Sequence, residues 1–87
     1  MYKITYSDRF KKSYKKLSKT EQQQLKNKVA LLCENPMHPS LRTKKIKGTE
    51  KIFESSVNMS VRLIWKFDGA AIILMLDTGH HDILKQF

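Results

Sequence analysis

Residues 61–76 read VRLIWKFDGAAIILML, and this stretch decides the fold. In its first half, apolar side chains at every second position alternate with residues such as Arg62 and Lys66, which is the period of a strand that buries one face. The Asp-Gly dipeptide at residues 68–69 favours a tight hairpin turn. The apolar run over residues 70–76 predicts a second strand, central in its sheet and covered on both faces. The stretch therefore predicts two antiparallel strands.

The N-terminal part of the chain has the pattern of one strand followed by two helices. Residues 2–6 alternate between apolar and polar side chains, as in a half-buried strand. Ser7 is placed to cap a first helix, and Thr20 with Gln23 fits a capping box at the start of a second. The Asn-Pro pair at residues 35–36 ends that second helix. The apolar positions follow helical spacing: Phe10, Tyr14 and Leu17 in the first helix, Leu25, Val29 and Leu32 in the second. Few residues separate the helices, so we expect an antiparallel hairpin.

The remaining segments predict further strands and a short chain end. Residues 42–46 and 51–57 are expected to form strands on either side of a turn. Gly79 is expected to end the central strand, and residues 81–87 to form a short helix or coil. No repeat or linker divides the chain, so residues 1–87 are expected to form one domain. The predicted fold class is α+β, with an N-terminal strand, an antiparallel helix hairpin packed on a mainly antiparallel sheet of about four or five strands, and a short C-terminal helix.

The composition limits which binding partners and which cellular compartment are expected. Seventeen Lys and Arg against eight Asp and Glu give a formal net charge of +9, which attracts nucleic acid, acidic proteins or anionic surfaces. The longest apolar run is far shorter than the roughly 20 residues that span a bilayer, and the first residues do not read as a signal peptide. The single Cys33 cannot form an internal disulfide. We therefore expect a cytoplasmic protein without a membrane segment.

Basic side chains gather around the predicted strands. Alternation directs Arg62 and Lys66 to the face opposite the core, and part of a neighbouring basic cluster is expected to join them. That cluster comprises Arg42, Lys44, Lys45, Lys47 and Lys51. A basic, concave sheet face suits a polyanionic backbone, because each neutralised phosphate releases counterions. The alternative is that these lysines only protect sheet edges against aggregation.

A pair of histidines follows the predicted central strand. His80 and His81 stand where a strand end presents side chains from a rigid scaffold. A histidine there titrates near neutral pH and can act as a general acid or base. The alternative is that both are surface residues, or that one caps the short terminal helix. We expect no metal site, because adjacent His side chains diverge and His38 is distant in the sequence, and we expect no cofactor.

The order of these elements, together with three segments, resembles the RelE/ParE toxin superfamily, especially its RelE and YafQ-like members that cleave messenger RNA. The three segments are residues 41–48, 60–65 and 77–84, and the resemblance covers nearly the whole chain. It implies the toxin of a type II toxin–antitoxin system, a ribosome-dependent and metal-free endoribonuclease that inhibits translation. In that reaction the ribose 2′-hydroxyl attacks the adjacent phosphate, which needs charge stabilisation at phosphorus and proton transfer at both oxygens.

The resemblance also implies roles for single residues. Arg62 matches the family's phosphate-binding arginine, whose fork of donors suits phosphate oxygens. His81 matches the catalytic histidine of YafQ-like members and is expected to protonate the leaving 5′-oxygen. Phe87 falls near the family's terminal aromatic residue, which would stack on a base. The alternative for Phe87 is hydrophobic docking of the chain end.

The chain departs from the family in the segment before the arginine strand. RelE carries lysines there and YafQ-like members carry His and Asp, whereas residues 53–56 of this chain read FESS. The general base is therefore open between Glu54 and His80. Phosphate contacts are expected from lysines in and around the predicted strands: Lys44, Lys45, Lys47, Lys51 and Lys66.

Two other functions are compatible with the same fold. A ParE-like member would inhibit DNA gyrase by binding it, without nuclease activity, and an inactive toxin-like module would only bind a partner. The combination of Arg62 with His81 favours the ribonuclease. In every case an acidic antitoxin protein is the expected partner, because its charge complements that of this chain. The ribonuclease would also have the ribosome and mRNA as partners.

Overall fold

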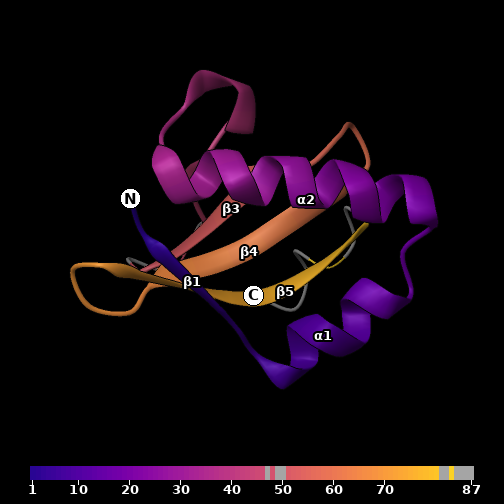
Figure 1. The fold of residues 1–87 in the computed structure, drawn as a ribbon, viewed down its shortest axis with the longest axis horizontal. Helices are drawn as coiled ribbons and strands as arrows, with labels where there is room; N and C mark the ends of the chain where they lie inside the picture. Colours follow the sequence, from indigo (N-terminus) through magenta and orange to yellow (C-terminus); the bar gives the residue numbers. More distant parts are fainter. Residues whose placement is uncertain (47, 49–50, 81–82, 84–87) are drawn as a thin grey trace.

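The computed structural model describes residues 1–46, 48, 51–80 and 83. Its elements in chain order are β1 (Lys3–Tyr6), α1 (Asp8–Lys15), α2 (Lys19–Glu34), the 3₁₀ helix η1 (Pro39–Leu41), β2 (Lys44–Lys45), β3 (Ile52–Ser56), β4 (Val61–Phe67) and β5 (Ile72–His80). The described strands form one five-stranded sheet in the order β1-β5-β4-β3-β2. Only β1 and β5 are parallel within it. Figure 1 shows α2 lying across one face of this sheet. The predicted α+β fold is confirmed.

We call the side of the sheet under α2 the helix face and the other side the outer face. The predicted pattern of β4 is confirmed. Val61, Leu63 and Trp65 are fully buried on the helix face, in one core cluster with apolar residues of both helices. Each such side chain contributes about 1.5–3 kcal/mol to stability when it leaves water. Arg62 and Lys66 alternate with these residues and lie on the outer face.

β5 differs from its prediction in two ways. The strand runs through Gly79 to His80, because Gly79 stays paired with Arg62 of β4. Its burial also alternates: Ile73 and Met75 are fully buried on the helix face, whereas their neighbours Ile72, Leu74 and Leu76 are half-buried. The structure therefore differs from the expectation of a strand covered on both faces, because Leu74 on the outer face is half-buried whereas Asp77 on that face is buried.

A turn and a bulge shape the hairpin of β4 and β5. The predicted turn is confirmed, and Gly69 occupies it with φ of 83°, a conformation that favours glycine. Opposite Ile64 and Trp65 of β4, the unpaired Leu76 of β5 forms a bulge that shifts the register by one residue. Because side chains alternate along a strand, this shift decides which residues reach each face beyond the bulge. It places Asp77 and Gly79 on the outer face.

Both helices begin at serine caps. Ser7 caps α1 as predicted, and its hydroxyl accepts a hydrogen bond from a first-turn amide at 3.0 Å. The prediction of Thr20 as the cap of α2 is wrong. The Ser18 hydroxyl accepts from the Glu21 amide at 3.1 Å, and the Glu21 carboxylate accepts from the Ser18 amide at 2.9 Å. A carboxylate accepts more strongly than the side-chain amide of Gln23, which favours the earlier capping box.

The strand predicted over residues 42–46 is reduced to Lys44 and Lys45. Before it the chain forms η1, and Arg42 adopts a left-handed conformation with φ of 50° and ψ of 43°. The Arg42 amide donates to the Pro39 carbonyl at 3.2 Å. The turn that begins at Pro39 therefore removes Arg42 from the sheet.

A chain of buried hydrogen bonds ties this segment to β3. Ser55 is fully buried, and its hydroxyl accepts from the indole Nε1 of Trp65 at 2.9 Å. The Ser55 hydroxyl also lies 2.7 Å from Oγ1 of Thr43, which donates to the Pro36 carbonyl at 2.7 Å. The indole N–H is thus satisfied inside the core, as buried donors require.

Of the predicted terminal helix, only Ile83 belongs to the described part of the chain. It packs against Gly79, where an added Cβ atom would stand 2.6 Å from its Cγ2. Residues 81–82 and 84–87 lie outside the described residues. Among the residues that the structure describes, no helix is long and apolar enough to cross a membrane.

Candidate functional site

The side chains of the outer face form rows across the sheet, because residues paired on neighbouring strands point the same way. The row at the end of the sheet where β4 begins consists of Ser56, Arg62 and Gly79. Both cross-strand neighbours of Arg62 are therefore small. Ser56 leaves room beside the guanidinium for a group from outside the sheet, whereas Ile83 fills the space over Gly79.

The guanidinium of Arg62 is oriented by the turn between β3 and β4. Its Nη1 donates to the Asn58 carbonyl at 2.8 Å and to the Val61 carbonyl at 3.3 Å. The Asn58 side chain in turn accepts from the Ser60 and Val61 amides and donates to Oε1 of Gln24, each at 2.8 Å. Within the described residues, Nε and Nη2 of Arg62 have no partner. These donors are available to an anion.

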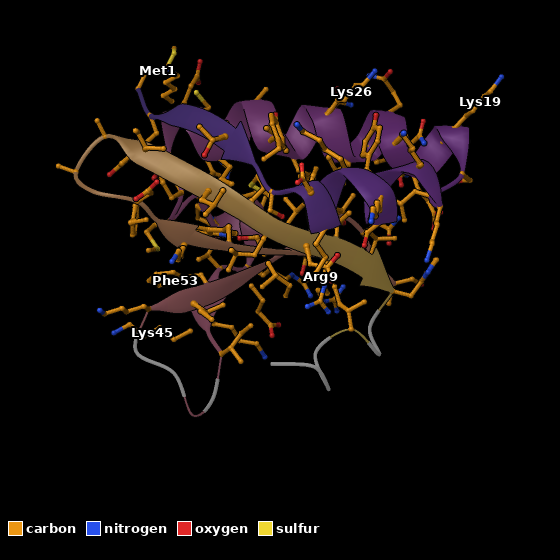
Figure 2. All side chains as sticks on the ribbon, turned by 90° about the horizontal axis from the view of Figure 1, so that it is seen from below. Met1, Arg9, Lys19, Lys26, Lys45 and Phe53 are labelled. Carbon is orange, nitrogen blue, oxygen red and sulfur yellow. The ribbon has the colours of Figure 1, made fainter. Side chains whose placement is uncertain are left out.

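The second row of the outer face consists of Lys44, Glu54, Ile64 and Asp77. Nζ of Lys44 lies 3.7 Å from Oε1 of Glu54, and Nε of Arg9 lies 3.0 Å from Oδ2 of Asp77. Figure 2 shows Arg9 beside the end of β5. Ile64, between the two carboxylates, is fully buried. The basic sheet face expected from the sequence is therefore interrupted beside Arg62, where the second row has an apolar centre and paired charges.

His80 lies on the helix face, away from Arg62. It is paired in register with Val61, whose side chain is in the core, and its Nε2 lies 2.9 Å from Oε2 of Glu21. The hydrogen bond from the Ser18 amide, and after it the contact with His80, lowers the pKa of Glu21. The structure thus joins His80 to the start of α2 and does not bring it together with Arg62.

A hollow of about 550 Å³ between α1 and the end of β5 is lined by His80 and by basic side chains of the first helix. These basic residues are Arg9, Lys12 and Lys16. Sequence reasoning missed them as neighbours of the histidine. Their spacing at i, i+3 and i+7 is the available signal, because it places them on one helical face.

A second hollow, of about 290 Å³, is lined by Arg62 together with Lys28 and Arg42. Sequence reasoning did not single out Lys28 and named Arg42 only within the basic cluster. The three residues come from α2, from the end of η1 and from β4. No spacing in the sequence joins them, so only the tertiary structure reveals the group.

The lysines predicted to contact RNA are spread over the molecule. Lys66 lies on the outer face in a third row with Ile52, and Lys44 lies in the second. Lys45 is paired with Phe53 on the other side of the sheet, where Figure 2 shows both residues far from β5. Lys51, exposed, precedes β3. The other predicted site residues lie outside the described part of the chain: Lys47, His81 and Phe87.

A family match covers almost the entire sequence. The sequence model of the family described as "Bacterial toxin of type II toxin-antitoxin system, YafQ" matches residues 2–86. This range includes every described strand and helix. No curated protein sequence matches the chain.

Several solved structures share the fold. YafQ from E. coli strain BL21(DE3) is 22% identical with a TM-score of 0.77, over 97% of this chain and 98% of that chain. A chain of the intact E. coli RelBE toxin–antitoxin complex is 23% identical with a TM-score of 0.74, over 92% and 96% of the two chains. A chain of the archaeal RelE–RelB complex from Pyrococcus horikoshii OT3 is 16% identical with a TM-score of 0.75, over 91% and 93%. At these identities the likeness concerns the fold.

Proposed function

Because the chain belongs to the YafQ family of bacterial type II toxins, we propose that it is a ribosome-dependent endoribonuclease that cuts messenger RNA in the cytoplasm and inhibits translation. The net charge of +9 supports a nucleic-acid substrate, since it favours association with a polyanion. The observation that carries the proposal is the pairing of Arg62 with Gly79. It sets the proposed phosphate-binding group near the end of β5, where His80 is the last strand residue and His81 follows in the sequence.

The proposed reaction needs no group other than amino-acid side chains. The ribose 2′-oxygen forms a bond to the adjacent phosphorus while the bond from phosphorus to the 5′-oxygen breaks. The products are a 2′,3′-cyclic phosphate and a 5′-hydroxyl. Arg62 binds the non-bridging oxygens through Nε and Nη2 and stabilises the charge that develops on them. The small neighbour Ser56 leaves space for the phosphate on the β3 side of Arg62, whereas Ile83 fills the space over Gly79.

His81 is the proposed general acid. It donates a proton to the 5′-oxygen as that oxygen leaves, a role that suits an imidazole near neutral pH. The assignment rests on the match of residues 77–84 to the family pattern, since His81 lies outside the described residues. Its loss is expected to remove most of the activity.

Glu54 is the better candidate for the general base. It shares the outer face with Arg62 and stands in the neighbouring row, opposite Ile64. The other candidate, His80, lies on the helix face and contacts Glu21. A base must reach the 2′-hydroxyl of the ribose whose phosphate Arg62 holds, which favours the residue on the same face.

The remaining proposed contacts surround this site. Lys44 and Lys66 share the outer face with Arg62 and are proposed to bind backbone phosphates of the message. Lys45 and Lys51 are exposed on other sides and suit ribosomal RNA instead. Lys47 as a phosphate contact and Phe87 as a base-stacking residue are proposed from the sequence alone.

An acidic antitoxin is the proposed protein partner. A groove of about 530 Å³ between the two helices has an apolar lining with lysines at its border. The apolar residues are Tyr6, Phe10, Tyr14, Leu25 and Val29, and the lysines are Lys11, Lys15 and Lys26. This combination suits an amphipathic helix with acidic residues beside its apolar face. The antitoxin is therefore proposed to dock such a helix between α1 and α2.

Controlled expression in bacteria tests the proposed activity. The parent chain is expected to arrest growth, and primer extension on translated messages is expected to show cuts within codons. Arg62→Ala and His81→Ala should relieve the arrest while the folded protein still accumulates. Lys19→Ala, an exposed change at the start of α2, is the control and should stay toxic. Growth arrest with gyrase-linked DNA breaks and uncut messages would instead identify a ParE-like inhibitor.

A further inference from the structure

We propose that the hollow lined by Lys28, Arg42 and Arg62 binds a backbone phosphate of the RNA strand that the protein cuts. We call it the phosphate hollow; it lies between α2, the end of η1 and the turn from β3 to β4. The inference rests on the proposed function, since it names how the same strand is held. It adds Lys28 and Arg42 as RNA-binding residues.

The lining of the phosphate hollow is cationic and polar. Beside its three basic residues, the described lining residues are uncharged: Ser40, Ser56, Val57, Asn58 and Met59. No carboxylate is among these described residues to neutralise the three positive charges. An anion that enters would therefore remove a repulsion as well as gain hydrogen bonds. The volume of about 290 Å³ is several times the ~30 Å³ of one water, which leaves room for a phosphodiester.

Arg62 reaches the hollow in a fixed orientation. The Asn58 carbonyl accepts a hydrogen bond from Nη1 of Arg62 at 2.8 Å, and the Asn58 side chain donates a hydrogen bond to Gln24 of α2. The guanidinium is thus oriented before any ligand arrives, which reduces the entropy lost on binding. Its remaining donors, Nε and Nη2, form the planar fork that matches two oxygens of one phosphate, so the phosphate in the hollow is the one that Arg62 holds for cleavage.

Arg42 reaches the hollow through an uncommon backbone conformation. Its φ of 50° costs a residue other than glycine roughly 1–2 kcal/mol. Such costs persist mainly where a site requires them. The Arg42 side chain is exposed, and in the part of the chain that the structure describes it makes no hydrogen bond or ion pair. It is therefore available to a ligand.

Lys28 approaches the same hollow from α2. Its Nζ lies 3.5 Å from the Ser40 carbonyl, a contact at the limit of hydrogen bonding. The ammonium can therefore turn to a phosphate oxygen at little cost. Three cations from three elements then surround one anion, an arrangement that a single surface lysine does not provide.

A phosphate suits this hollow better than an acidic peptide segment does. A peptide that binds tightly needs apolar anchor side chains in buried pockets, and among the described lining residues only Val57 and Met59 are apolar. The groove between α1 and α2 offers that apolar lining instead. A phosphodiester needs only the charged and hydroxyl donors that the phosphate hollow presents.

Binding of an uncleavable oligonucleotide tests the inference separately from catalysis. The probe is a short, dye-labelled, single-stranded RNA with 2′-O-methyl riboses, and its affinity for the full chain is measured by fluorescence anisotropy. Lys28→Gln and Arg42→Asn are expected to raise Kd about fivefold to tenfold each. Asn tolerates the left-handed backbone at position 42. The matched control is Lys19→Gln on the same helix, with less than about a twofold change. The double variant should also lower the slope of log affinity against log salt by about 0.7, as expected for one lost phosphate contact.

Three further binding measurements identify the ligand. The variants Lys28→Gln and Arg42→Asn should lose as much affinity for a DNA oligonucleotide of the same sequence as they lose for the RNA. A loss of affinity for RNA alone would overturn the phosphate assignment. Unchanged binding of vacant ribosomes by the variants supports the message as the source, whereas a loss there would point to ribosomal RNA. Poly-glutamate serves as the probe for an acidic protein. If the variants lose affinity for poly-glutamate alone, the hollow binds an acidic protein and its assignment to RNA is overturned.

The two proposals fail in different ways. If both variants bind the oligonucleotide as Lys19→Gln does, the phosphate hollow is refuted whatever the activity of the parent. If the parent does not cut messages but the variants lose oligonucleotide binding, the nuclease proposal fails and the phosphate hollow stands as a nucleic-acid site. Equal thermal midpoints of all variants confirm that each one is folded.

Discussion

Arg62 of β4 and Gly79 of β5 face each other across the outer face of the sheet, and Ile83 fills the space that a side chain at position 79 would take. The bulge at Leu76 of β5 creates this pairing, because without the shift Thr78 would stand opposite the arginine. Ile83 therefore packs on β5 on the side where Arg62 lies. The site depends on a glycine at 79 for close approach.

Gly79→Ala is expected to displace Ile83, since the new methyl group would stand 2.6 Å from its Cγ2. We expect mRNA cleavage on ribosomes to fall by about tenfold or more, because small displacements of reacting groups are costly. The free energy of unfolding should fall by only about 1 kcal/mol. Cleavage in a reconstituted translation reaction and urea unfolding measure the two effects.

The control for this prediction is the double variant Gly79→Ala with Ile83→Ala, which removes the clashing Cγ2 atom. It should recover part of the activity lost in the single variant. Full activity in Gly79→Ala alone would show that close packing at this position does not matter.

The layers of the fold could be predicted from local patterns in the sequence. The alternation around Leu63 and Trp65 identifies β4 because one face of that strand is buried and the other is not. Local patterns also predict the first helix and its Ser7 cap, because a helix cap and the apolar spacing of a helix involve residues only a few positions apart. These features depend on interactions that are close in the chain.

The site was less accessible to sequence reasoning because long-range interactions build it. The bulge that sets Gly79 opposite Arg62 has no local signal, and it also decides that His80 reaches the helix face. The left-handed turn at Arg42 replaces a predicted strand, because a contact with Pro39 overrides the strand preference. Lys28 joins the site only through the packing of α2 on the sheet.

Ser55→Ala should lower the free energy of unfolding by about 1–3 kcal/mol. The change leaves the buried indole N–H of Trp65 without its acceptor and removes the hydroxyl partner of Thr43. Urea unfolding monitored by tryptophan fluorescence measures the loss. Ser60→Ala, at an exposed turn position, is the control and should change stability by less than about 0.5 kcal/mol. Equal stability of both variants would rule out a structural role for this hydrogen bond.

Glu21→Gln tests the charge in the capping box of α2. Hydrogen bonds from the Ser18 amide and then from His80 lower the pKa of Glu21 in the folded state. A carboxyl whose pKa is lower when folded stabilises the protein above its unfolded pKa and loses that contribution as the pH falls through the folded pKa. The parent should therefore melt at a higher temperature than Glu21→Gln at neutral pH, and the difference should shrink below about pH 4. Circular dichroism melts measure it; a difference that stays constant across this range would contradict the assignment.

Arg9→Ala should destabilise the contact between α1 and β5. Asp77 is almost fully buried, and without Arg9 its charge keeps only the Thr78 amide as a partner among the described residues. We expect a loss of about 1–3 kcal/mol in urea unfolding, less than for a fully buried pair because half of the Arg9 side chain is exposed. Combining Arg9→Ala with Asp77→Asn should cost less than the sum of the two changes. Strict additivity would mean that the ion pair does not couple the helix to the strand.

Single-turnover cleavage of a message on programmed ribosomes tests the central claim most directly, namely that Arg62 and His81 act on one phosphate. The parent chain should produce new 5′-hydroxyl ends, and Arg62→Ala and His81→Ala should each slow the reaction by about a hundredfold or more. The double variant should be little slower than either single variant, because the two groups serve the same transition state. Cleavage that persists at the parental rate in folded Arg62→Ala or His81→Ala protein, or no cleavage by the parent, would contradict the account.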